Sequence, residues 1–315
     1  MSNAFLQHIS QKVGAGLDYE LSSNRASYTI VGSSNCTAVS LSIPSMFRGK
    51  PVTKIASGAF LNKTNLKRVF IPDSITEIGE QAFGGCRNIE HMTIPTYNEV
   101  SAFTYPLGYI FGKTEYEGGE KTEQYYYSGG VDGWRYWTSY IPSSLKSIIF
   151  TGNIGRIDAH KYGFFYNCKN LKRVLLPNIT WLPPHFLDNC TGLESLELSD
   201  SLTTINVHAL NNIGVKSLII PDSVTNISYN VTISGKNLES IVFPVSLTSI
   251  QFSTFGTTSP LKYFFYRGTA AQWSKVTIDV NNDCITPDIV YYYSETQPTT
   301  GGRYWRYLDG VPTVW

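Results

Sequence analysis

Apolar residues recur in this chain every 22 or 23 residues, and this repeat constrains the fold more than any other feature. In the unit that begins at Leu66, Val69 and Ile71 recur with a period of two, which is a strand pattern, and Pro72 ends it because proline donates no backbone hydrogen bond. The residues equivalent to Leu66 are Ile89, Leu171, Leu193, Val215, Leu238 and Leu261. A second column contains Ile55, Ile78, Leu182, Ile205, Ile227 and Ile250. A fixed period of this length predicts a solenoid, in which each coil packs on its neighbours.

The repeat divides the chain into segments. The ends need caps, because a terminal coil would otherwise expose an apolar face and an unpaired strand edge. Residues 96–143 lack the repeat, and a structureless stretch of that length would be implausible, so we expect one or two hairpins there. The expected segments are a remnant of recombinant expression (1–4), an N-terminal tether and β-hairpin cap (5–44), repeats (45–95), an aromatic-rich hairpin insertion (96–143), further repeats (144–268) and a C-terminal cap (269–315).

The composition excludes several classes of partner. The formal net charge is +1 without basic or acidic blocks, which argues against nucleic acid and anionic membrane surfaces, and no apolar run is long enough to span a bilayer. Cys86, Cys168 and Cys190 belong to the repeat and are predicted to be buried thiols, whereas Cys36 and Cys284 are predicted to be free. No Cys-x-x-Cys pair, nucleophile elbow, zinc-protease motif or phosphate-binding glycine loop occurs. We therefore expect no cofactor and no enzyme activity, and a monomer.

One face of the predicted sheet is the first candidate binding site. If Val69 and Ile71 point inward, Phe70 points outward, because side chains alternate across a strand. The outward column is mostly apolar, which is typical of a contact surface, and Arg68 and Arg173 flank it. Strand propensity alone, or an insertion folded over this face, would explain the pattern equally well. The candidate residues in this column are Phe70, Ile149, Leu175, Glu197, Ile219, Val242 and Phe265.

Two further groups are candidates. In the insertion, Tyr109, Tyr126, Trp134 and Trp137 could stack on sugar rings or anchor a protein, or they could pack together as the core of the hairpins. Three histidines (His160, His185 and His208) each follow a repeat-column residue by three positions. Imidazoles stacked about 5 Å apart could bind a divalent transition metal, although a solvent-facing slot without metal explains the same spacing, and we assign no metal site.

The unit Leu-x-x-Val-x-Ile-Pro-Asp-Ser-Ile-Thr, followed by Ala-Phe and Cys, resembles the BspA-type bacterial leucine-rich repeat over roughly residues 41 to 266 without the insertion. The resemblance implies a β-rich α+β fold, a curved leucine-rich-repeat solenoid with a parallel sheet on its concave face. It also implies a secreted or surface-attached bacterial protein linked to adhesion, without enzyme activity. Leu210 replaces the usual Phe, and Asn230-Val231-Thr232 replaces Ala-Phe, so we expect the convex side to be irregular at both places.

These observations together predict a non-enzymatic extracellular scaffold that binds a protein or glycan ligand through its concave strand face. The alternative is a carbohydrate- or cell-wall-binding module that uses the aromatic insertion and the C-terminal aromatics. We expect an extracellular or cell-surface location, with any secretory signal removed from the expressed chain.

Overall fold

The computed structural model describes residues 16–95, 107–127, 134–151, 163–176, 178–227, 230–255, 260–299 and 301–315, without the side chains of 125–127 and 134. The chain forms two compact units, residues 1–154 and 155–315. Both are β-rich, and the one α-helix in the described residues is a single turn. None of the helices in these ranges is long and apolar enough to cross a membrane.

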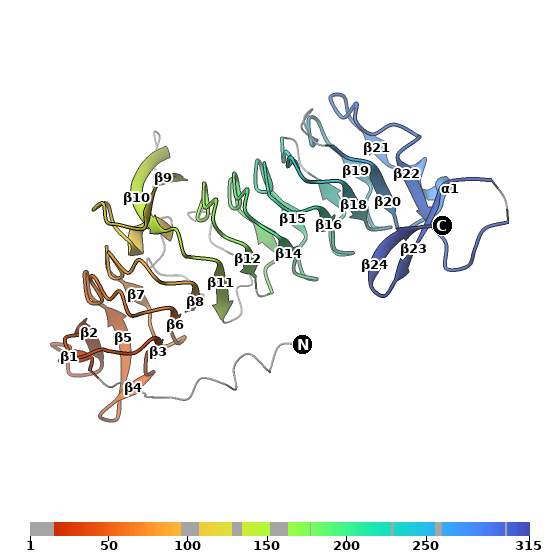
Figure 1. The fold of residues 1–315 in the computed structure, drawn as a ribbon. Helices are drawn as coiled ribbons and strands as arrows, with labels where there is room; N and C mark the ends of the chain where they lie inside the picture. The colour runs from red at the N-terminus through yellow and green to blue at the C-terminus, as the bar shows by residue number, and fades with distance from the viewer. Residues whose placement is uncertain are drawn as a thin grey trace. The chain divides into compact units, whose positions relative to one another are not determined.

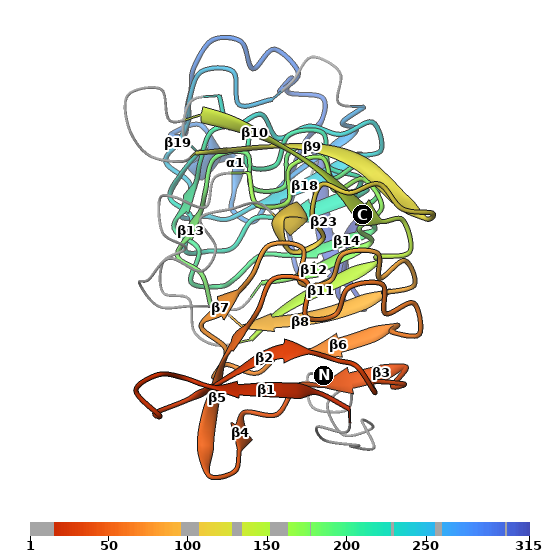
Figure 2. The same cartoon turned by 90° about the vertical axis from the view of Figure 1, so that its left-hand side faces the viewer.

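In the first unit, short parallel strands stack in register, one from each coil. The order is β3, β6, β8 and β11, and Val69 of β6 lies opposite Leu41 of β3 and Met92 of β8. Figure 2 shows these four strands one above the next. Their bounds are Ser40–Ser42 (β3), Arg68–Phe70 (β6), His91–Pro95 (β8) and Ser147–Thr151 (β11).

A second sheet of this unit begins with an antiparallel hairpin. Strands β1 and β2 form the hairpin, and β2 pairs in parallel with β5, which pairs with β4 and β7. Tyr19 stacks on Phe47 with ring centroids 3.9 Å apart, which packs the hairpin against the β4 strand. The bounds are Asp18–Leu21 (β1), Tyr28–Gly32 (β2), Met46–Phe47 (β4), Lys50–Ile55 (β5) and Glu77–Ile78 (β7).

The segment 96–143 is only partly an insertion. Strands β9 (Gly119–Tyr127) and β10 (Trp134–Pro142) form an antiparallel hairpin, which rises from the top of the unit in Figure 1. The 3₁₀ turn η1 (Leu107–Ile110) instead continues the solenoid, because the backbone N–H groups of Gln81 and Phe83 donate to the carbonyls of Tyr109 and Ile110. Residues 107–112 thus pair with the preceding coil, although the apolar spacing places them in the insertion.

The second unit repeats the arrangement. Strand β12 pairs in parallel with β14, and a longer ladder runs β16, β18, β20, β22, β23 and β24. The ladder is parallel up to β23, and β24 is antiparallel to β23. The bounds are Arg173–Leu175 (β12), Ser195–Glu197 (β14), Ser217–Ile219 (β16), Ser240–Phe243 (β18), Tyr263–Tyr266 (β20), Val290–Tyr293 (β22), Tyr304–Leu308 (β23) and Val311–Val314 (β24). Residues 289–315 thus contain three strands.

Shorter strands pair on the other side of these coils. Strand β13 (Trp181–Leu182) pairs with β15 (Thr204–Ile205), and β17 (Asn226–Ile227), β19 (Ser249–Ile250) and β21 (Thr277–Ile278) form a second ladder. The helix α1 (Ala270–Trp273) follows Thr269, whose side chain accepts from the Gln272 N–H in a capping box.

The core is built from the two repeat columns. Every member of the column of Ile55 is buried, and so is every member of the column of Leu66 except Leu261. All five cysteines are free thiols; four are buried and Cys284 is half-buried. The Cys86 and Cys190 thiols donate to backbone carbonyls one coil back, at 3.0 and 3.1 Å. Buried thiols that fill the corner between coils are what the repeat predicts.

A left-handed residue marks the same corner of successive coils. Equivalent positions with φ between 51° and 68° are occupied by Gly58, Gln81, His185, His208, Asn230 and Ser253. The irregularity expected at Leu210 is absent, because His208 and Asn212 are left-handed four residues apart, as His185 and Asn189 are one coil earlier. The next coil does differ, since its left-handed residues Asn230 and Thr232 are only two apart.

Candidate ligand-binding groove

We use the name ladder face for the strand side chains that point away from the core. In the first unit, Phe70, Thr93 and Ile149 lie side by side in register on this face and are half-buried. In the second unit, Leu175 is half-buried, Glu197 is exposed, and Ile219 is 38% exposed. Arg68 and Arg173, at the start of their strands, are exposed. These predicted residues are therefore placed where a ligand could reach them.

Two predicted ligand-binding residues are not accessible. Val242 and Phe265, which continue the column of Ile219 in register, are 0% and 2% exposed. Trp305 of β23, itself 0% exposed, lies over them, with its ring centroid 5.0 Å from that of Phe265. Val242 and Phe265 are therefore not exposed as the sequence predicts, because the C-terminal strands fold back over this end of the ladder face.

The β23–β24 hairpin is anchored by polar contacts as well as by packing. The Trp305 indole N–H donates to the Tyr266 carbonyl at 2.9 Å. The Arg267 guanidinium donates to the Tyr307 hydroxyl at 3.0 and 3.2 Å and forms an ion pair with Asp222 at 2.6 Å. Arg267 thus links the hairpin to a turn two coils earlier and helps to fix the position of the hairpin.

A groove of about 1250 Å³ opens next to the part of the ladder face that the C-terminal strands cover. Its floor contains Ile219 and the hydroxyl-bearing residues Ser195, Ser217 and Ser240, and the Ser240 hydroxyl donates to that of Ser217 at 2.9 Å. Its far wall is the tip of the hairpin, Gly310, Val311 and Pro312. Val311 is 60% exposed, so an apolar floor and an apolar wall both face the opening.

The two long edges of the groove carry opposite charge. Lys172 and Lys216 lie at the edge where the strands begin, together with Glu194, whereas Glu197, Asp200 and Asp222 lie where the strands end. Lys172 pairs with Glu194 at 3.2 Å. No carboxylate among the described residues lies within 4.0 Å of the Lys216 ammonium. Lys216 is therefore a cation of the groove that remains available to a ligand.

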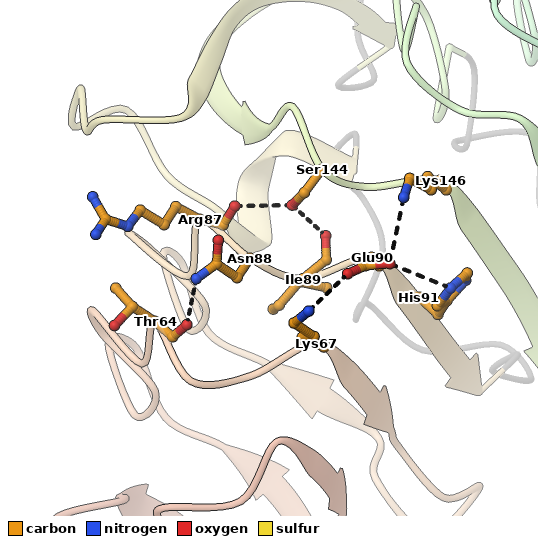
Figure 3. Close-up of polar contacts among 9 residues, drawn as sticks. All are labelled: Thr64, Lys67, Arg87, Asn88, Ile89, Glu90, His91, Ser144 and Lys146. Atoms are coloured by element: carbon orange, nitrogen blue, oxygen red, sulfur yellow. Dashed lines mark hydrogen bonds and ion pairs between the residues drawn. The ribbon is translucent and has the colours of Figure 1, made fainter.

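Lys216 belongs to a column that our sequence analysis missed. Positions one residue before Arg68 and its equivalents carry lysine or glutamate, and within each unit they form ion pairs between coils. In the first unit, Glu90 lies 3.4 Å from both Lys67 and Lys146, as Figure 3 shows. The hydrogen bonds and charges of these lysines lower the pKa of Glu90, although its partial burial opposes the shift. The same 22- or 23-residue period would have identified Lys67 with Glu90, and Lys172 with Glu194, Lys216, Glu239 and Lys262, and Lys146 belongs to the same column because it directly precedes Ser147 of β11.

His91 lies beside this column. Its Nδ1 is 2.7 Å from the Ser147 hydroxyl, and Glu90 lies 4.0 Å from its Nε2. Burial lowers the pKa of His91, and the positive charge of Arg68 lowers it further. Figure 3 shows Ser144 on the same side of the unit, where its hydroxyl donates to the carbonyls of Arg87 and Ile89. These contacts join neighbouring coils.

The aromatic insertion contributes a separate surface. The Lys113 ammonium lies 3.9 Å from the centre of the Trp137 ring, and Trp137 is 9% exposed and packs against half-buried Tyr109. Both predicted aromatics are therefore partly or wholly enclosed. Tyr136, which was not among the predicted residues, is 71% exposed. The side chains of Tyr126 and Trp134 lie outside the described residues.

Two of the three aligned histidines are neighbours. The ring centroids of His185 and His208 are 5.0 Å apart, as the repeat predicts, and His185 Nδ1 lies 2.8 Å from an oxygen of buried Asp188. Burial lowers the pKa of His208, and His185 adds to the shift. His160 lies outside the described residues, and within the described ranges no three His, Cys, Asp or Glu side chains are arranged to hold a metal ion.

Comparisons with known proteins bear on the family alone. A model of the BspA type leucine rich repeat region matches in six copies over residues 32–106 and 158–279, which is more than half of the chain. No curated protein matches. A leucine-rich repeat protein from Bacteroides ovatus is 20% identical, with 89% of this chain and 81% of that chain covered and a TM-score of 0.36. The pneumococcal vaccine antigen PcpA is 18% identical, with 87% and 79% covered and a TM-score of 0.41. The family match agrees with the stacked coils described above, and the chain belongs to the BspA-type leucine-rich repeat family.

Proposed function

We propose that this chain is a non-enzymatic extracellular scaffold that binds a macromolecular partner through its ladder face. Membership in the family supports a scaffold for protein interaction, and BspA-type proteins are typically associated with bacterial surfaces. The observation that carries the proposal is the row of apolar side chains on this face that stay accessible in both units. Phe70 and Ile149 are half-buried, and Ile219 is exposed at the floor of a groove. Apolar side chains that gather on a solvent-facing sheet usually mark a contact surface.

The proposal predicts that charge on the ladder face abolishes partner binding. A displayed library of folded extracellular domains, sorted with the labelled chain, supplies partners, whose affinities are then measured for Phe70→Asp and Ile219→Asp. Each substitution buries a carboxylate against an apolar partner, so affinity should fall by about tenfold or more. Phe252→Asp is the control, because Phe252 is exposed and lies outside the groove. Partners that bind all three variants equally well would refute the assignment of this face.

A second function has one observation in its favour. Tyr136 presents an exposed ring on the β9–β10 hairpin, and such rings can stack on sugars. If the chain is a carbohydrate- or cell-wall-binding module, Tyr136→Ala should remove binding on a glycan array while Ile219→Asp leaves it intact. The reverse result favours the scaffold. Deleting the whole segment 96–143 would not separate the two, because Phe111 within it is buried in the core.

A further inference from the structure

The hairpin that covers one end of the ladder face shows what this face can bind. Trp305 lies on the surface formed by Val242 and Phe265, and Tyr293 and Tyr307 surround it with ring centroids 5.2 and 5.0 Å away. Its indole N–H reaches a backbone carbonyl at the end of β20. The apolar column thus accepts an aromatic side chain that is supplied by β23, near the C-terminal end of the same ladder, and one hydrogen bond fixes this side chain.

The groove continues the same column without that cover. Ile219 is the register partner of Val242, so it offers the next apolar position along the column. Ile219 remains 38% exposed, and the hairpin tip with Val311 and Pro312 stands opposite it. The space therefore has an aliphatic floor, an aliphatic wall and serine hydroxyls beside the floor. A flat aromatic ring fits these surroundings, since it buries much apolar area at low entropic cost and can use a hydroxyl as a hydrogen-bond partner.

The charges around the groove specify a second feature of the ligand. Asp222 is engaged by Arg267, and Glu197 lies 3.9 Å from Arg173, so these two carboxylates already have cationic partners. Lys216 has none in the described residues, and it lies three residues before Ile219, about 10 Å along the strand. A carboxylate of the ligand placed two or four residues from its aromatic side chain lies on the same face of an extended segment and would reach this ammonium. Exposed charge pairs of this kind contribute more to selectivity than to affinity.

We infer that the groove binds an extended segment of a partner protein, with an aromatic side chain on Ile219 and an acidic side chain toward Lys216. The inference rests on the proposed function and narrows the partner to a polypeptide with this pattern. An aromatic side chain is expected on Ile219 because Trp305 packs on the neighbouring part of the column, and the same apolar surface continues from Val242 to Ile219.

The test uses labelled synthetic peptides and the whole chain. One peptide of serine and threonine carries a single tryptophan and an aspartate two residues later, so that both side chains lie on the same face of the extended segment. A second has alanine for the tryptophan, and a third has lysine for the aspartate. Fluorescence anisotropy should show binding of the first peptide, about tenfold or greater loss without the tryptophan, and about three- to tenfold loss with lysine. Binding that is independent of the tryptophan would overturn the inference, and so would an absence of binding by all three peptides.

Variants of the chain locate the binding. Ile219→Asp and, on the opposite wall, Val311→Asp should each weaken the first peptide by about tenfold, whereas Phe252→Asp should not. Val311→Asp is included because Val311 is 60% exposed at the hairpin tip, so this substitution should not disturb the packing of the groove floor. Lys216→Glu should reverse the preference, so that the lysine peptide binds better than the aspartate peptide. An unchanged preference would refute the role of Lys216.

Other occupants give different results. If sedimentation shows a dimer that Ile219→Asp dissociates, the groove belongs to a second copy of this chain and the inference is overturned. If displayed partners depend on Phe70 while the peptides do not bind, the proposed scaffold stands and only the inference fails. If the peptides bind the groove but no displayed partner depends on either ladder-face variant, the proposed function fails instead.

Discussion

Removing the Trp305 side chain should release the C-terminal hairpin from the ladder face. Trp305 has no exposed surface, contacts Val242 and Phe265, and donates a 2.9 Å hydrogen bond to the Tyr266 carbonyl. Truncating a buried tryptophan to alanine typically costs about 3–5 kcal/mol, because apolar burial is lost and a cavity remains. Since each coil of a solenoid contacts only its neighbours, this cost should fall on the last strands and not on the whole unit.

The loss can be divided with a second variant. Trp305→Phe keeps most of the apolar contact but leaves the buried Tyr266 carbonyl without its donor, which should cost about 1–3 kcal/mol. Urea unfolding followed by far-ultraviolet circular dichroism gives the free energies of unfolding for both variants. In Trp305→Ala we expect a separate early transition, because a loss of about 3–5 kcal/mol at the hairpin is a large fraction of a domain stability of about 5–15 kcal/mol.

Hydrogen exchange then shows where the change occurs. In Trp305→Ala, protection should fall in β20, β22 and β23, while β13 and β15 in the same unit keep theirs. The newly exposed Val242 and Phe265 should also extend the apolar surface of the groove. A loss below about 1 kcal/mol, with protection unchanged in β20 and β22, would contradict the anchoring role of this side chain.

Three further predictions concern ionisable groups. Burial and the neighbouring imidazole lower the pKa of His208, so the unfolded chain binds the proton more tightly, and stability should fall as the pH drops below about 6.5. His208→Asn, which places there the residue type of the equivalent Asn230, should flatten this slope in urea unfolding at pH 7.5 and 5.5, and an unchanged slope would exclude His208 as its cause. Glu90→Gln should cost about 0.5–1 kcal/mol in low salt and less in 1 M salt, because the two lysine pairs are near the surface. In native protein at pH 8, a thiol reagent should label half-buried Cys284 first, and Cys86 only after unfolding, since burial raises the pKa of Cys86 to about 12; equal labelling rates by mass spectrometry would contradict this.

The repeat alone was enough to predict the stacked coils, because residues one period apart must become neighbours when every coil has the same length. Val69 and Met92 are paired as the spacing requires, and Phe70 and Ile219 point away from the core. The burial of Phe265 could not be predicted in this way. It depends on Trp305, which lies 40 positions later and outside the repeat, and no periodic argument relates the two.

The insertion illustrates a second limit. Ile110 and Phe111 fill the place of the usual Ala-Phe pair, and Phe111 is fully buried, but they stand beyond the unit length that the other coils share. A search by spacing assigns them to the insertion. The charged column that includes Glu90 and Lys216 is also periodic in the sequence, but a pattern defined by apolar residues does not include it because the column contains only lysine and glutamate.

The left-handed corner of each coil has a consequence for how such a protein can vary. The backbone there already adopts φ near 50–70° with Gly, Gln, His, Asn or Ser in place, so the identity of the side chain does not decide the bend. β-Branched residues are disfavoured by their crowding in this conformation, which Thr232 nevertheless adopts, whereas short or unbranched polar ones are interchangeable. The corners therefore form a row of exchangeable side chains at a spacing of about 5 Å, on which new surface chemistry can arise without disturbing the coils beneath.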